Sequence, residues 1–395
     1  MRPCFYPSPA RRIRMTHILR DRAAVADLFG DRVIYRNLAP CDSCLPSLRD
    51  AWREIGLGSS RIPRKAEPAY GQVVAWLLRR AQQTDHPGVP LRELIYLGDT
   101  RLLDGTAFAN LKKALGLPGW AFIASENASA APQIVQEEDR FIANRWNALP
   151  EFVAWVRSQG GRFDSGTAFV VDLDKTAIGA RGRNDKPIDQ ARIEGVERTV
   201  ADVLGAAFDR EAFLKAYQTL NQPAFHPFTA DNQDYLAYIC LIIGAGLISL
   251  PELVQDVESG QMVDFAQFIR WADTVVPFAG QDGLLEIHQS VYARVQLDDP
   301  TPFKTFRRNE YLCTVARLGH LPDDVPLAER LLHEICITYE VWQATAWARA
   351  RGALLLALSD KPDEASLPTE ELAAQGRLPL HRTPTHVVGE EIRLP

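Results

Sequence analysis

Three short apolar runs, each stopping at a polar residue, constrain the fold of this chain more than any other feature of its sequence. The runs are residues 94–97 before Gly98-Asp99, residues 168–171 before Asp172, and residues 354–358 before Ser359. None alternates apolar and polar residues, and such continuous runs are typical of parallel strands that are covered on both faces. We therefore expect three buried strands of one parallel sheet.

Helical patterns separate these strands. Apolar residues recur three and four positions apart in 68–82, 106–115, 149–157 and 331–351, and weaker strand patterns lie at 33–35, 120–123 and 386–388. Strands that alternate with helices indicate an α/β fold of three layers, in which helices cover both faces of a Rossmann-like parallel sheet. Because ligands bind such sheets at the carboxyl ends of the strands, the polar residues after the three runs are expected at a binding edge.

The stretch from residue 188 to residue 345 has a different pattern, with helices joined by loops that contain Pro and Gly. We predict that it is a large helical unit inserted into the α/β fold. The expected organisation is a tail and lead-in over 1–32, the first part of the α/β core over 33–187, the helical insert over 188–345, and the second part of the core over 346–395. The loop 182–186 is a candidate hinge between core and insert.

Composition excludes several classes of protein. The chain has 44 basic and 50 acidic residues, a net charge of −6, whereas general nucleic-acid binding needs clustered positive charge. Six cysteines in 395 residues are too few for a disulfide scaffold, which favours a reducing, cytoplasmic setting. Residues 1–14 carry arginines without an apolar stretch behind them, so a basic tail is expected there and not a secretory signal. The uncharged run 235–251 falls short of a bilayer span and predicts a buried helix, so no membrane contact is expected.

Two acidic motifs follow the predicted strands. In Asp172-Leu173-Asp174 the two carboxylates are two residues apart, and in extended backbone they project to the same side. Such a pair can divide its work between an ionised nucleophile or metal ligand and a general acid/base. After Gly98, residues Asp99 and Asp104 offer the hard oxygen ligands that Mg²⁺ prefers. Taken singly, each motif is also compatible with an ordinary turn or a helix N-cap.

Taken together, these residues resemble the haloacid dehalogenase superfamily of phosphohydrolases. The first motif of that family, DxDxT after an apolar strand, is similar to Asp172, Asp174 and Thr176. Its fourth motif, GDxxxxD, is similar to the segment 98–104. Its second motif, a Ser or Thr after a strand, matches Ser359.

The third motif of the family is a basic residue that opens a helix. Lys65 fits it best, and Lys361 is the competitor. The motifs then follow one another in the order third, fourth, first, second, whereas the family order starts with the first. The core therefore resembles a circularly permuted one, which is tolerable because termini usually lie on the surface. The alternative is a homodimer in which two chains exchange core halves to complete each site.

The resemblance implies a Mg²⁺-dependent phosphohydrolase that acts on a small phosphorylated substrate. Asp172 would be the nucleophile that forms an aspartyl-phosphate, and Asp174 the general acid/base. The implied Mg²⁺ ligands are Asp172, the backbone carbonyl of Asp174, Asp99, and Asp104 close by or through water. Ser359 and Lys65 would neutralise phosphoryl oxygens, and the helical insert would be a cap that closes over the substrate.

Other readings stay open. A dehalogenase would use the same aspartate without a metal, and a non-catalytic interaction module would keep only the fold. The basic cluster Lys304, Arg307 and Arg308 is either a substrate contact from the insert or a solvated helix face. The pair Cys41 and Cys44 forms a lone CxxC, whereas a zinc site needs four ligands.

Overall fold

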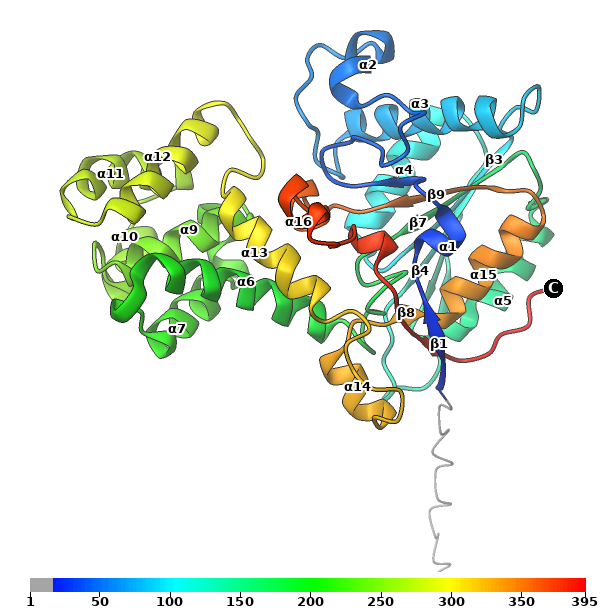
Figure 1. Cartoon of the computed structure of the whole chain (residues 1–395). Helices are drawn as coiled ribbons and strands as arrows, with labels where there is room; N and C mark the ends of the chain where they lie inside the picture. Colours follow the sequence, from blue (N-terminus) through cyan, green and yellow to red (C-terminus); the bar gives the residue numbers. More distant parts are fainter. Residues whose placement is uncertain (1–16) are drawn as a thin grey trace, which may run out of the picture.

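A sheet of seven strands runs through the α/β unit of the molecule (Figure 1). The computed structural model describes residues 17–395, so the basic tail expected over 1–14 lies outside the described residues. In order across the sheet, the strands are β2 (Val33–Ile34), β9 (Leu354–Leu358), β7 (Thr167–Asp172), β3 (Glu93–Gly98), β4 (Gly119–Ala124), β6 (Arg140–Ala143) and β5 (Ile134–Gln136). All neighbours are parallel except β5 and β6.

The three apolar runs are confirmed as strands, and they are direct neighbours. The central one is β7, with β3 on one side and β9 on the other. Every residue of these strands is buried, in accord with their continuous apolar sequence. In the register, Asp172 pairs with Leu358 and Val171 pairs with Leu97, so the three strands end at one edge of the sheet.

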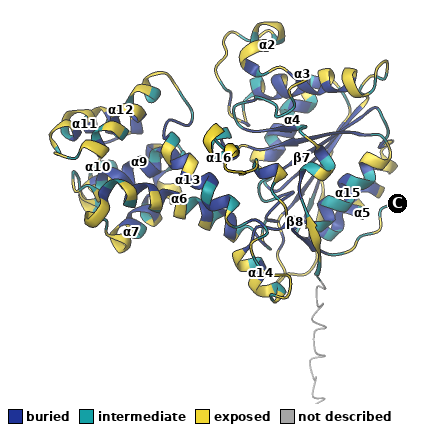
Figure 2. Ribbon diagram, viewed as in Figure 1, coloured by how far each residue is buried: buried dark blue, intermediate teal, exposed yellow. Residues whose placement is uncertain are grey.

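Helices cover both faces of this sheet, which confirms the predicted three-layer α/β architecture. The helices α3 (Pro68–Asp85) and α4 (Leu103–Leu115) lie on one face, and α5 (Leu149–Ser158) and α15 (Tyr339–Ala350) lie on the other (Figure 1). Successive residues of a strand point to opposite faces. Accordingly Tyr96 belongs to the apolar cluster under α3 and α4, whereas Leu97 belongs to the cluster under α5 and α15. The central strands between the two helical layers are dark in the burial view (Figure 2).

A second, smaller sheet joins the two ends of the described chain. It contains β1 (Ile18–Ala23), β10 (Thr385–Gly389) and β8 (Ile337–Thr338), with β10 in the middle. The strand expected at 386–388 exists, but it lies in this sheet. The single helix expected over 331–351 is wrong, because α14 (Leu327–His333) ends before β8 and α15 begins after it. The β-branched residues 335, 337 and 338 favour extended backbone at this break.

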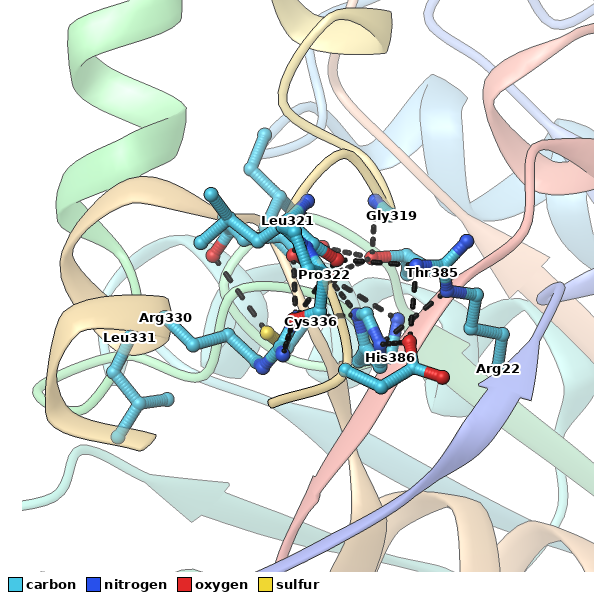
Figure 3. A network of polar contacts seen from close by, with 12 residues as sticks. Arg22, Gly319, Leu321, Pro322, Arg330, Leu331, Cys336, Thr385 and His386 are labelled. Atoms are coloured by element: carbon cyan, nitrogen blue, oxygen red, sulfur yellow. Dashed lines mark hydrogen bonds and ion pairs between the residues drawn. The ribbon is translucent and has the colours of Figure 1, made fainter. Parts of the chain in front are cut away.

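A buried polar network fixes this break (Figure 3). The ring of His386 in β10 contacts the carboxylate of Glu334 and lies 3.0 Å from that of Asp323. Arg330 of α14 donates to Glu334 over 2.8 Å, and both of these side chains are fully buried. Burying charged groups is tolerated only when they are paired, so the network explains why polar residues interrupt the apolar pattern here.

The inserted segment forms a helical unit with its own apolar core beside the α/β unit (Figure 1). Its main helices are α6 (Lys186–Leu204), α7 (Arg210–Leu220), α8 (His226–Thr229), α9 (Gln233–Gly244), α10 (Leu250–Glu258), α11 (Phe265–Val275), α12 (Asp282–Gln296) and α13 (Lys304–Val315). The helical unit therefore ends before residue 345, because β8 and α15 belong to the α/β unit. Three further short helices are α1 (Ala26–Phe29), α2 (Leu48–Ile55) and α16 (Glu370–Ala374).

The uncharged run 235–251 lies largely in α9, which is a buried helix as expected. Among the helices of residues 17–395, none combines the length and the apolar character that a membrane crossing requires.

Candidate functional site

The site is built at the carboxyl edge of the three central strands. Asp172 is the last residue of β7, Asp99 follows β3, and Ser359 follows β9. All three are buried. The parallel pairing of the strands therefore brings together, at one edge, polar residues that are far apart in the sequence.

Three carboxylates converge at this edge. One oxygen each from Asp99, Asp104 and Asp172 lie within 4.8 Å of one another, and all three residues are buried. Gly98 makes this possible, because a Cβ atom at that position would lie 2.6 Å from Cγ of Asp104. A set of hard oxygen donors at this spacing suits a divalent cation such as Mg²⁺.

Lys65 lies between two of these carboxylates, three residues before α3 begins. Its Nζ donates to Oδ1 of Asp104 over 2.6 Å and to Oδ1 of Asp172 over 2.5 Å. Burial opposes a charged ammonium, but the charges of Asp104 and Asp172 raise the pKa of Lys65 well above its ordinary value, so it stays protonated. We name Lys65, Asp99, Asp104 and Asp172 the acidic cluster.

Asp104 acts as the organiser of this cluster. Its Oδ2 accepts hydrogen bonds from the backbone N of Asp99 (3.1 Å) and from the backbone N and Oγ1 of Thr100 (2.8 and 2.7 Å). Its Oδ1 accepts from Lys65 and from the hydroxyl of Tyr96 (3.1 Å). With five donors on two oxygens, Asp104 fixes the turn that presents Asp99 and has little capacity left as a direct ligand.

The acidic cluster is short of positive charge. Burial raises the pKa of Asp172 well above its ordinary value, and neighbouring Asp104 adds to this effect although Lys65 opposes it. Burial and the charge of Asp104 also raise the pKa of Asp99, to about 7. Both directions mean that the protein destabilises the charged forms of these groups, so a bound cation would find a favourable field here.

The turn after β7 positions the remaining residues of the first motif. The Oγ1 of Thr176 donates to Oδ2 of Asp172 over 3.2 Å, and the backbone N of Ala177 donates to the carbonyl of Asp172 over 3.1 Å. Asp174 is half-buried, and no donor within residues 17–395 forms a hydrogen bond with its carboxylate. Asp174 thus lies next to the acidic cluster in sequence, and its carboxylate forms no hydrogen bond among the described residues.

Lys361 does not share the position of Lys65. The Oγ of Ser359 accepts from the backbone N of Lys361 over 3.0 Å. The Nζ of Lys361 instead reaches Oε1 of Glu310 in α13, over 2.6 Å. Of the two lysines considered from the sequence, only Lys65 contacts Asp172.

The basic cluster of α13 is not directed at the carboxylates. Arg307 is buried between Asp234 (2.5 Å) and Glu310 (2.7 Å). Lys304 pairs with Asp299 and with Glu364 (3.1 and 2.7 Å), while Arg308 is exposed. The first two residues therefore hold elements together, which differs from the expectation of a solvated helix face.

Arg181 is a site residue that the sequence did not single out. Its Nε donates to Oδ2 of Asp99. It lies seven residues after Asp174, in the loop that leads to α6. No rule of spacing connects such a loop arginine with the GDxxxxD segment, so only the structure could reveal the contact.

The candidate hinge loop 182–186 is tightly held. Arg183 pairs with Glu126 over 2.6 Å and with Glu340 over 2.8 Å. The side chain of Asn184 donates to the carbonyls of Leu331 and Glu334 and accepts from the backbone N of Cys336, each over 2.8 Å. This amide thus joins the two ends of the inserted segment.

The cysteines of the lone CxxC, Cys41 and Cys44, differ in their environment. Burial raises the pKa of Cys41 to about 12, while Cys44 is exposed. Within residues 17–395, no further ligand joins this pair in a metal-binding group.

Comparisons of the chain with family models, with curated proteins and with solved structures give no match.

Proposed function

We propose that the protein is a Mg²⁺-dependent phosphohydrolase that acts on a small phosphorylated substrate. The observation that carries the proposal is the convergence of Asp99, Asp104 and Asp172 around Lys65, at the carboxyl edge of a parallel sheet. This arrangement agrees with the resemblance to the haloacid dehalogenase superfamily.

Three residues have separate roles in the proposed reaction. Asp172, oriented by Lys65 and Thr176, attacks the phosphorus and takes the phosphoryl group as an aspartyl-phosphate. Asp174, whose carboxylate is unengaged, protonates the leaving oxygen and then removes a proton from the attacking water. Ser359 provides a hydroxyl for the phosphoryl oxygens at the tip of the neighbouring strand.

The donor set fits a hard divalent cation. Asp99, Asp172 and the backbone carbonyl of Asp174 would hold it, and Asp104 would orient Asp99. When bound, Mg²⁺ supplies positive charge against the phosphoryl oxygens. Lys65 supplies one charge of the same kind from this chain.

The charge of the site separates this function from the dehalogenase reading. Three buried carboxylates face one lysine and one arginine, Lys65 and Arg181. Displacement of a halide from carbon has no use for a cation, whereas phosphoryl transfer requires positive charge at the oxygens. The excess of carboxylates therefore favours the phosphohydrolase.

The permuted motif order and the cap belong to the same proposal. The strands β3, β7 and β9 are direct neighbours within one chain, as a permuted core requires. The helical unit contacts the loops after β7 and β9, through Asp189 with Lys175 (2.8 Å) and Glu310 with Lys361. These contacts support a role as the cap over the site.

The test is the variant Asp172→Asn, assayed against a panel of phosphate esters with Mg²⁺. We expect a loss of kcat of about 10⁴-fold or more, because the nucleophile is removed. The matched control is Asp139→Asn, which changes a carboxylate paired with Lys112 away from the site. Circular dichroism checks the fold of both variants. Undiminished turnover by a folded Asp172→Asn protein would exclude the mechanism.

A further inference from the structure

The backbone of Arg181 is held in place by hydrogen bonds that are separate from its side-chain contact with Asp99. The carbonyl of Arg181 accepts from the backbone N of Glu126 (2.9 Å) and from Nε1 of Trp146 (3.3 Å). Its own backbone N donates to the carbonyl of Lys175 (2.8 Å). Arg181 is therefore fixed between the turn after Asp174 and the segments that follow β4 and β6.

The next residue, Gly182, has no room for a side chain. Gly182 has a φ of +79°, and a Cβ atom there would lie 1.9 Å from the carbonyl oxygen of Glu126. Only glycine adopts this conformation at so close an approach. The loop is thus built to hold the Arg181 backbone at one place beside Asp99.

The guanidinium contacts only one side of the Asp99 carboxylate. Its Nε donates to Oδ2, and in residues 17–395 no hydrogen bond from a nitrogen or hydroxyl donor reaches Oδ1. The Arg181 side chain is 32% exposed, whereas that of Asp99 is 6% exposed. A carboxylate held in this way has a fixed orientation and one oxygen left for a ligand.

We propose that Arg181 is the positioning residue for Asp99, holding this carboxylate so that its free oxygen can bind the divalent cation. The inference rests on the proposed function. Carboxylates that ligate metals are commonly oriented by hydrogen bonds from outside the ligand set, and losing such a partner weakens metal binding by about 10- to 100-fold. Arg181 acts through Asp99 and needs no contact with the substrate.

The experiment is a titration of the metal-free protein with Mn²⁺, followed by the signal of free Mn²⁺ in electron paramagnetic resonance, without substrate. The proteins compared are the wild type, Arg181→Gln, Arg181→Lys and the control Arg101→Gln. Arg101 is an exposed arginine near the site that pairs with Glu137. We expect Arg181→Gln to bind Mn²⁺ about 10- to 100-fold more weakly, Arg181→Lys to recover part of the affinity, and Arg101→Gln to match the wild type.

The outcomes separate the two proposals. A wild type that binds no Mn²⁺ would remove the proposed function and this inference together. Equal binding by the wild type and Arg181→Gln would overturn the inference alone, and tighter binding by Arg181→Gln would overturn it by making Arg181 a competitor of the metal. If Arg181→Gln does not fold, Arg181→Lys and Arg181→Met are titrated in its place. Equal Mn²⁺ affinity of these two variants would also contradict the positioning role of Arg181.

A kinetic measurement adds a second readout. If Arg181 acts through metal affinity, saturating Mg²⁺ should restore most of the kcat of Arg181→Gln with little change in KM. A loss of kcat that persists at saturating Mg²⁺ would overturn the positioning role and would indicate direct contact with the phosphoryl group.

Discussion

The molecule contains two buried charge clusters with opposite balance. In the acidic cluster, Lys65 contacts Asp104 and Asp172, while the third carboxylate, Asp99, contacts Arg181. In the second, which we name the junction cluster, Lys361, Arg307 and Arg192 surround Glu310, and Arg307 also pairs with Asp234. The first cluster has an excess of carboxylates, and the second has an excess of cations.

The pKa shifts of Asp172 and Glu310 have opposite directions. Burial raises the pKa of Asp172 despite the charge of Lys65. Burial acts in the same direction on Glu310, but the charges of Lys361, Arg307 and Arg192 outweigh it and hold its pKa well below the ordinary value. Burial of charge is therefore not in itself a sign of function. The surrounding cations outweigh burial at Glu310, and this group stabilises the fold, whereas Lys65 does not outweigh burial at Asp172, which can accept a further cation.

The largest expected contrast is between the two lysines. Lys65→Met should lower kcat/KM by about 10³-fold or more, because among residues 17–395 Lys65 supplies the one positive charge in contact with Asp172. Lys361→Met should lower it by less than about 5-fold, because Lys361 contacts Glu310 in the helical unit. Steady-state kinetics on the same phosphate ester measures both. Equal losses in the two variants would break the distinction between the clusters.

The junction cluster should contribute more to the stability of the fold than the acidic cluster does. Glu310→Gln leaves the buried Lys361 and Arg307 without their shared carboxylate, and breaking such a pair costs about 3 kcal/mol in the free energy of unfolding. Urea denaturation at pH 7 measures the change. The control Glu329→Gln alters a glutamate of α14 outside the junction cluster. A loss no larger than that of the control would contradict the structural role of the cluster.

The contributions of Glu310 and Asp172 to the free energy of unfolding should change with pH in opposite directions. Because Glu310 has a lowered pKa in the folded protein, its contribution is complete above about pH 4.3 and declines as the pH falls further. Asp172 has a raised pKa in the folded protein, so its ionisation opposes folding as the pH rises above about 3.9.

Denaturation between pH 2 and pH 7 in the presence of a chelator tests this contrast. The deficit of Glu310→Gln should shrink as the pH falls below about 4.3. Asp172→Asn should gain stability relative to the wild type as the pH rises above about 3.9. Parallel pH profiles for the two variants would mean that the clusters do not differ in charge balance.

The three central strands were predictable because the pattern that indicates each of them lies within a few consecutive residues. The runs that became β3, β7 and β9 are apolar throughout, since both of their faces are covered. The short strand β5 is fully exposed, and β6 has only four residues, so neither left a distinct pattern. The error at 331–351 arose because apolar periodicity continues on both sides of a break that is fixed by distant His386.

The site followed from the sequence to the extent that parallel strands determine it. Asp99 and Asp172 meet because β3 and β7 are parallel neighbours. The contacts of Arg307 with Asp234 and of Arg181 with Asp99 link residues more than 70 positions apart through a loop and a helix packing. Such pairings depend on tertiary geometry and carry no periodicity.

The buried amide of Asn184 has a consequence for how this architecture can diversify. Its three hydrogen bonds connect the chain just before α6 with the last turn of α14 and the residues just after it. Entry and exit of about 150 residues therefore meet at one point, as insertions into stable domains require. A different segment could be joined at that point while the sheet and its carboxylates stay in place.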